Sequence, residues 1–174
     1  MKATKTAINR RHFLSAALGA TLLSGCGFHL RGEMTMPFKS IHIAGWEHHA
    51  LIADLRRRLR LNNVEVLDTP DDAEVILRIT RLAPEREILS LDASGKAREY
   101  RLFYYLGYAL DSADGRTLRA PERIVVRREY TYDSGQVLAK TQEESLLYSD
   151  MEKDLVTQLI RRLSATDLSA KPAG

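Results

Sequence analysis

The stretch from Ala97 to Leu110, AREYRLFYYLGYAL, decides the fold class of this chain. Large side chains alternate along it with a period of two, which is the spacing of residues on a β-strand. One side of the predicted strand carries Tyr100, Leu102, Tyr104, Leu106, Tyr108 and Leu110, and the other side carries Phe103, Tyr105, Gly107 and Ala109. The sequence therefore predicts one long strand with bulky side chains on both faces.

Turn signals bound this strand, and further strands follow from the same alternation. Asp92-Ala93-Ser94-Gly95 precedes it and the segment 111–115 follows it, and both are typical of turns. Further strands are expected over 39–44, 73–83 and 117–132. Pro121, near the start of the last one, indicates a bulge or a sheet edge. Strands joined by such short turns are expected to pair antiparallel.

Two amphipathic helices are expected, one after the first strand and one after the last. In the first, Leu51, Leu55 and Leu59 recur every four residues, and Asn62-Asn63 ends it. The second carries Leu147, Met151, Leu155, Leu159 and Leu163 at the same spacing. Thr141, with Glu144 three residues later, resembles a capping box, which predicts that the second helix starts there.

The order strand, helix, three strands, helix predicts an α+β fold. We expect a two-layer sandwich, a four-stranded sheet with two amphipathic helices on one face, within a domain over 38–164. A chain of 174 residues has room for one such domain. Residues 165–174 are expected to form a flexible tail.

The charge of the chain is unevenly distributed. The formal net charge is +3, but four of the 26 Lys and Arg residues precede Cys26 and none of the 23 acidic residues does. From Cys26 onward 22 basic residues face 23 acidic ones, so the formal charge there is −1. A body near neutrality lacks the global basic field of a nucleic-acid binder, so no nucleic-acid partner is expected.

Residues 1–25 have the parts of a secretory signal peptide: a basic start, the apolar run Phe13 to Leu23, and small residues before Cys26. Leu23-Ser24-Gly25-Cys26 resembles a bacterial lipobox, so we expect lipid attachment at Cys26 and a lipidated tether over 26–37. The alternative is a free cysteine after an ordinary signal. Gly27 after the cysteine favours outer-membrane sorting, facing the periplasm. Arg10-Arg11 leaves Sec and twin-arginine export both open.

Catalytic and metal motifs are absent from the sequence, which has no G-x-S-x-G, H-E-x-x-H or P-loop. His48-His49 is interpreted as a solvated helix start, because adjacent helical residues do not face one site. Asp71-Asp72 and Glu143-Glu144 are interpreted as structural acidic pairs. We therefore predict no enzyme activity, no cofactor and no metal site.

Two kinds of side chain indicate binding instead. Because the helices cover only one sheet face, the other is expected to expose aromatic rings suited to a protein interface. The interface candidates are Tyr104, Tyr105, Tyr108 and Tyr130. Lys96, Arg98 and Lys140 lie near turns, where they could bind phosphates through charge-assisted hydrogen bonds.

Several runs of residues resemble a known family. They are Gly25-Cys26-Gly27-Phe28-His29-Leu30-Arg31-Gly32, Leu59-Arg60-Leu61-Asn62-Asn63-Val64-Glu65, Arg98-Glu99-Tyr100 after Gly95, Val137-Leu138-Ala139-Lys140 and Gln158-Leu159-Ile160-Arg161-Arg162-Leu163. In this order they resemble LPS-assembly lipoproteins of the LptE type. The first run is the most specific, and the match extends over most of the chain after Cys26.

The resemblance implies a role that composition does not give. Members of the family sit inside the outer-membrane β-barrel of the LPS translocon, act as its plug and assembly partner, and bind LPS. It implies Lys140 as the first candidate for contact with LPS phosphates, with Lys96 and Arg98 near the equivalent hairpin. The resemblance implies the same small sheet with two helices on one side. Two other classes stay open: a stand-alone periplasmic lipid-binding lipoprotein, and a hydrolase built from scattered residues.

Overall fold

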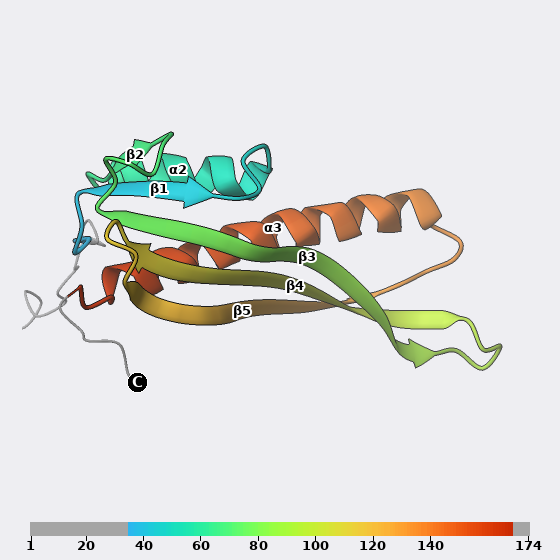
Figure 1. Cartoon of the computed structure of the whole chain (residues 1–174). Coiled ribbons are helices and arrows are strands. Elements are labelled where there is room, and N and C mark those ends of the chain that lie inside the picture. The colour runs from blue at the N-terminus through green and yellow to red at the C-terminus, as the bar shows by residue number, and fades with distance from the viewer. Residues whose placement is uncertain (1–34, 169–174) are drawn as a thin grey trace, which may run out of the picture. The chain divides into compact units, whose positions relative to one another are not determined.

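The computed structural model describes residues 35–168. The elements are β1 (Ser40–Ala44), α2 (Ala50–Leu61), β2 (Glu65–Leu67), β3 (Val75–Leu91), β4 (Ala97–Ser112), β5 (Thr117–Thr131) and α3 (Val137–Ser164). The strands form one five-stranded sheet in the order β2-β1-β3-β4-β5 (Figure 1). β1 is parallel to both of its neighbours, whereas β3, β4 and β5 pair antiparallel. The α+β class is thus confirmed, with a mixed sheet.

The predicted number of four strands is wrong, because β2 adds a fifth. This strand is three residues long, and only its middle residue, Val66, is buried. A single buried residue gives no alternation that could be recognised in the sequence. β2 forms because α2 ends at Asn62-Asn63, where Asn63 has a φ of 59°, and the chain then returns beside β1.

β3 continues well past the predicted end at Ala83 and reaches Leu91. Pro84 lies within it, opposite Tyr104 of β4. β1 pairs with β3 only as far as Arg78. Beyond that point β3 has no strand on its other side, so a proline without an N–H does not interrupt a second ladder. The β3–β4 hairpin therefore extends far beyond β1 (Figure 1).

The interpretation of Pro121 is confirmed, since β5 is an edge strand with an irregularity at this proline. Tyr108 pairs with Glu122 and Leu110 with Arg119, so β5 has one residue more than β4 in this interval. An extra residue of this kind is a β-bulge, and it leaves a position that a proline can occupy.

The capping box at Thr141 is wrong, because α3 begins one turn earlier at Val137. The Thr141 hydroxyl donates to the Val137 carbonyl oxygen at 3.0 Å, as hydroxyls inside helices do. The Glu144 carboxylate faces the sheet instead, where it accepts from the Tyr130 hydroxyl at 2.6 Å. The two side chains therefore serve other contacts than the helix start.

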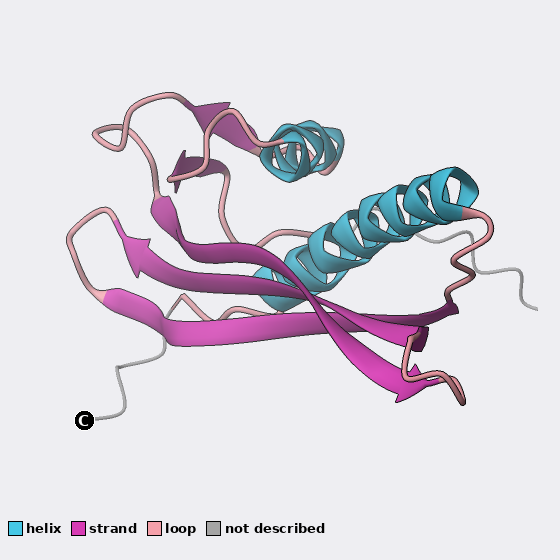
Figure 2. Ribbon diagram, turned by 90° about the vertical axis from the view of Figure 1, so that its right-hand side faces the viewer, coloured by secondary structure: helices cyan, strands magenta, loops and turns pink. Residues whose placement is uncertain are grey.

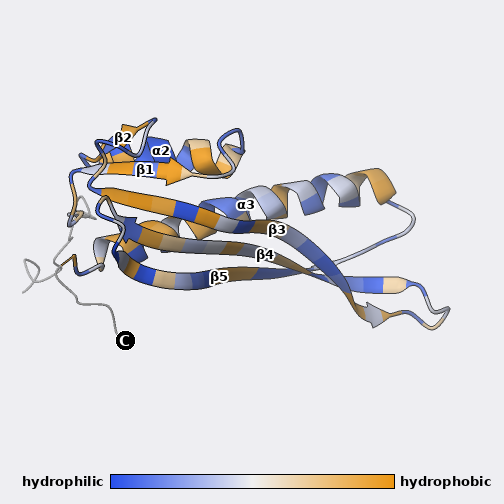
Figure 3. Ribbon diagram, in the orientation of Figure 1, coloured by the Kyte–Doolittle hydropathy of each residue, from blue (hydrophilic) through white to orange (hydrophobic). Residues whose placement is uncertain are grey.

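Both helices lie over the same face of the sheet (Figure 2). Buried leucines of α2, Leu51, Leu55 and Leu59, and the Leu155–Leu163 part of α3 supply the helical side of the core. Residues that alternate along the strands supply the other side, among them Leu77 and Leu106. Figure 3 shows β1 and the adjoining part of β3 as mostly hydrophobic, and the outer part of β3 as hydrophilic.

The segment predicted as a flexible tail, 165–174, begins with residues that pack on the domain. Thr166 is buried, and Leu168 packs partly buried against the core. The Thr166 hydroxyl donates to the Arg162 carbonyl oxygen at 3.1 Å and so satisfies one carbonyl of the last turn of α3. The predicted signal peptide, the predicted lipid attachment at Cys26 and most of the predicted tether lie outside the described residues.

Candidate functional site

The outer end of the β3–β4 hairpin carries two of the predicted cations, Lys96 and Arg98, both exposed. Asp92 builds the turn: its Oδ1 accepts from the Ser94 N–H at 2.8 Å, the Ser94 hydroxyl at 2.7 Å and the Lys96 N–H at 2.9 Å. These hydrogen bonds, with that of the Ser94 hydroxyl largest, lower the pKa of Asp92 below 3.8. Gly95 takes the positive φ of 80° that closes the turn.

The third predicted cation, Lys140, lies in the first turn of α3, at the same end of the sheet as the hairpin tip (Figure 1). Its Nζ lies 2.7 Å from Glu143 Oε2, and its side chain is only 19% exposed. Lys140 is thus paired within the helix, whereas Lys96 and Arg98 form no ion pair among the described residues. A negatively charged ligand would have to compete with Glu143 for Lys140.

Exposed aliphatic side chains accompany these cations. Ile88, Leu89 and Leu91 are exposed on β3 before the hairpin turn. Val137 and Leu138 are exposed in the first turn of α3, with Leu138 76% accessible. The hairpin tip and the first turn of α3 therefore each carry both apolar and cationic side chains, and we call these two segments together the outer end. Its chemistry suits an amphiphile with acyl chains and anionic groups.

A polar and aromatic cluster holds the first half of α3 to the sheet near the outer end. Arg86 of β3 lies 2.8 Å from Glu144 Oε2 and 4.5 Å from the centroid of the Tyr100 ring. Tyr100 in turn stacks on Tyr130 at 5.7 Å, and Tyr148 of α3 donates to the Glu85 carbonyl oxygen at 3.1 Å. Glu144 and Tyr148 thus hold this half of the helix to the sheet, the first through an ion pair and the second through a hydrogen bond.

The sequence did not indicate Arg86 or Glu144 as paired residues. Arg86 lies beyond Pro84, where the strand was expected to have ended, so its inward position could not be read from alternation. Glu144 was expected to cap its own helix. The sequence does contain a signal for this pair, namely the opposite charges of Arg86 and Glu144. If the strand is continued past Pro84, Arg86 faces α3.

Of the four predicted interface tyrosines, three are buried on the helix side and are withdrawn as interface residues. Tyr104, Tyr108 and Tyr130 are 2%, 0% and 6% exposed. Burial, followed by hydrogen bonds to Glu152 and Glu144, raises the pKa of Tyr104 and Tyr130 respectively. Tyr105 is half-buried on the opposite face and alone of the four keeps the predicted exposure.

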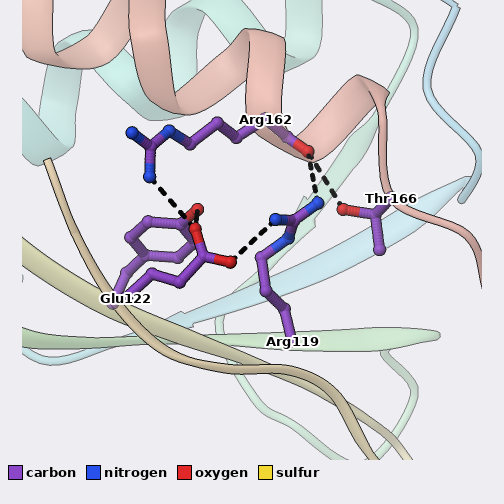
Figure 4. Close-up of polar contacts among 5 residues, drawn as sticks. Arg119, Glu122, Arg162 and Thr166 are labelled. Carbon is purple, nitrogen blue, oxygen red and sulfur yellow. Dashed lines mark hydrogen bonds and ion pairs between the residues drawn. The ribbon is translucent and has the colours of Figure 1, made fainter. Parts of the chain in front are cut away.

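A second polar cluster fixes the other end of α3 (Figure 4). Glu122 of β5 accepts from the Tyr108 hydroxyl at 2.9 Å, from Arg119 at 2.8 Å and from Arg162 at 3.0 Å. Burial alone would raise the pKa of Glu122, but the hydrogen bonds from Arg119 and Tyr108 outweigh it and lower the pKa below 4.5. Glu122 is half-buried, and a carboxylate with three such donors is structural.

In residues 35–168 no group of three or more His, Cys, Asp and Glu side chains could hold a metal ion. His49 instead caps α2, because its Nδ1 accepts from the Leu51 N–H at 3.1 Å. Within the same part of the chain, no helix is both long enough and apolar enough to cross a bilayer.

The surface hollows bear on the alternative of a lipid carrier. One of 240 Å³ lies between α2 and α3 and is lined by Asp54, Arg57, Glu152 and Lys153 among others. Another, of 400 Å³, is lined partly by Pro37, Leu118 and Leu168 and partly by charged residues. Both are open and carry charge, whereas an acyl chain is held in an enclosed apolar cavity.

Comparison with known proteins defines the class: a lipoprotein of the bacterial envelope. A solved structure of lipoprotein B from Nitrosomonas europaea is 34% identical, covers 80% of this chain and 91% of that one, and has a TM-score of 0.70. Rare lipoprotein B from Shewanella oneidensis is 30% identical, covers 73% of this chain and 95% of that one, and has a TM-score of 0.65.

The sequence comparisons give the family. Residues 38–163 match the LptE family, described as lipopolysaccharide-assembly. The LPS-assembly lipoprotein LptE of Photorhabdus laumondii is 29% identical over 88% of this chain and 86% of its own length. That of Pectobacterium atrosepticum is 27% identical over 88% and 86%. The chain belongs to the LptE family, which is a family of LPS-assembly lipoproteins and not of enzymes.

Proposed function

We propose that this protein is a lipid-anchored outer-membrane lipoprotein that assembles with and plugs the β-barrel of the LPS translocon, and that it binds LPS at the outer end. Family membership supports the assembly role. The observation that carries the LPS part is that exposed aliphatic residues accompany Lys96 and Arg98 on the hairpin and Lys140 in the first turn of α3, at the same end of the sheet. Lipid A presents the complementary pair of acyl chains and phosphates.

Lys140 is the residue on which the LPS proposal can be tested most sharply, because its present partner is known. Replacing Lys140 with glutamate removes the cation and places like charges at Glu143, so the affinity of the purified protein for LPS should fall about tenfold. Glu143→Gln frees the ammonium group, so the same affinity should rise about two- to fivefold.

Matched controls separate a local contact from a change in net charge. Lys153 is also on α3 and also pairs with an acidic residue three positions away, Asp150, at 2.8 Å. Lys153→Glu changes the net charge as Lys140→Glu does, and should leave LPS affinity unchanged. Unchanged affinity in both Lys140→Glu and Glu143→Gln would remove Lys140 from the proposal, with circular dichroism establishing that each variant is folded.

The assembly role needs a separate experiment. The tagged full-length chain is purified from detergent-solubilised outer membrane, and the bound proteins are identified. A stoichiometric barrel protein is expected. LPS recovered without a barrel would instead favour a stand-alone lipid-binding lipoprotein, the alternative that the small charged hollows disfavour.

Lipid anchoring at Cys26 is tested by metabolic labelling. Cys26→Ala should abolish incorporation of radiolabelled lipid and release the protein from the membrane fraction, because two or more acyl chains are needed for stable attachment. Label retained by the variant would reject the anchor.

A further inference from the structure

Within residues 35–168, no helix or strand covers the face of the sheet opposite the helices (Figure 2). The register of the antiparallel strands places Phe103 opposite Arg127, Tyr105 opposite Val125 and Gly107 opposite Arg123 on this face. It also places Arg81 beside Gly107 on the β3 side. We call Phe103, Tyr105, Arg123, Val125 and Arg127 the open-face patch.

Two arginines of this patch have no counter-charge. On the open face of β3, β4 and β5, Asp111 pairs with Arg78, Glu85 pairs with Arg81, and Glu87 and Glu129 share Arg101. Glu99 on the same face accepts a hydrogen bond from the Ser90 hydroxyl. Among the described residues, Arg123 and Arg127 form no ion pair. Two guanidinium groups without an ion pair therefore lie two register positions from the Tyr105–Val125 pair on the edge strand β5, although basic and acidic residues balance over the open face of β3, β4 and β5 as a whole.

The Tyr105 ring helps to hold one of these cations, Arg123, in place. Phe103 and Tyr105 stack with their centroids 5.9 Å apart and their planes at 12°. The guanidinium groups of Arg81 and Arg123 lie 5.0 and 5.5 Å from the centroid of Tyr105. A guanidinium that stacks on a ring keeps its N–H edge free to bind a carboxylate in a bidentate geometry. Val125, which is 40% exposed, lies between Arg123 and Arg127 along β5 and adds an apolar side chain to the patch.

We propose that the open-face patch docks on a carboxylate-bearing, strand-lined protein surface, namely the inner wall of the barrel partner. The inference rests on the proposed function and specifies which face meets the partner and with what charge. Aromatic and arginine side chains at the centre, with paired charges around them, are the composition of a protein interface. The patch belongs to two adjacent strands of one sheet, which favours a protein wall over an acyl chain or a sugar.

The experiment uses the tagged, lipidated full-length chain. In Arg123→Glu/Arg127→Glu, recovery of the barrel from detergent-solubilised outer membrane should fall about tenfold or more, because like charges across an interface are strongly unfavourable. The matched control, Arg57→Glu/Lys153→Glu, changes the net charge equally on the helix side and should recover the barrel within about twofold of wild type. Arg123→Lys/Arg127→Lys keeps the charge but loses the planar guanidinium group, which can bind a carboxylate through two hydrogen bonds. Recovery of the barrel by this variant should therefore be intermediate.

The outcomes distinguish this inference from the proposed function. If the wild type recovers no barrel, the proposed function fails and the inference fails with it. If the wild type recovers the barrel and the glutamate variant recovers as much, the inference alone is overturned. A variant that keeps the barrel but loses LPS would identify the patch as a lipopolysaccharide site and also overturn it. If the glutamate variant is unfolded by circular dichroism, Arg123→Gln/Arg127→Gln replaces it, with reduced barrel recovery again expected.

Discussion

Replacing Glu122 with alanine is expected to lower the free energy of unfolding by about 2–5 kcal/mol. The buried Tyr108 hydroxyl would lose its acceptor at 2.9 Å, which costs about 1–3 kcal/mol for a stranded polar group. Arg119 and Arg162 would each lose a contact, but these side chains are 25% and 38% exposed. Solvent screening therefore limits each arginine contact to about 0.5–1 kcal/mol.

Glu122→Ala should also change how the free energy of unfolding depends on pH in the acid range. The folded pKa of Glu122 lies below its ordinary 4.5. A depressed carboxyl pKa gives stability that is fully present above the unfolded value and is lost as the pH falls through the folded value. The stability difference between wild type and Glu122→Ala should therefore be largest at neutral pH and shrink below about pH 4.5. Urea unfolding of the purified protein at a series of pH values measures it.

Tyr108→Phe is the companion variant, because it removes the hydroxyl and leaves the carboxylate with its arginines. In a double-mutant cycle the two residues should show a coupling of about 0.5–3 kcal/mol. A loss below about 0.5 kcal/mol in Glu122→Ala, the range of ordinary surface changes, would refute the reasoning. So would a wild-type advantage that persists undiminished in acid.

Three further substitutions test other parts of the fold. Gly107→Ala would place a Cβ 2.6 Å from Thr80 Oγ1, so thermal unfolding should show a loss of about 1–3 kcal/mol. Leu155→Ala, at a fully buried position of α3, should lower stability by about 2–5 kcal/mol in urea, and a smaller loss would mean that the helix packs less tightly there. Because the pKa values of Tyr104 and Tyr130 are raised above 10.0, their contribution is present below pH 10 and lost as the pH rises through the folded values. In the Tyr104→Phe and Tyr130→Phe variants, the free energy of unfolding should therefore fall less with rising pH above 10 than in the wild type. An equal fall would contradict the raised pKa values.

Local patterns predicted the elements that carry many regularly spaced side chains. The alternation of large side chains over 97–110 predicted β4 to within two residues of its end at Ser112. Gly95 has the positive φ expected of the turn before it. Elements whose bounds depend on a distant partner were missed. β2 exists only as a neighbour of β1, and the outer part of β3 is held by pairing with β4 across Pro84.

The tyrosines illustrate why the site was predicted only in part. Tyr104 and Tyr108 share the parity of Leu102 and Leu106, and a face that buries leucines buries these rings as well. Their hydroxyls then need acceptors, which Glu152 and Glu122 supply from elements distant in sequence. Tyr105 has the opposite parity and therefore stays on the uncovered face.

The two proposed functions, LPS binding and docking on the barrel, are assigned to two separate surfaces. The outer end, with Lys96, Arg98 and Lys140, lies at the hairpin turn and the start of α3, whereas Arg123 and Arg127 lie on the open face of β5. Within residues 35–168 no hydrogen bond or ion pair joins the side chains of the two groups. Substitutions at sites without shared contacts act nearly additively. A loss of LPS binding and a loss of barrel recovery can therefore be assigned to separate surfaces, even when the corresponding substitutions are combined in one chain.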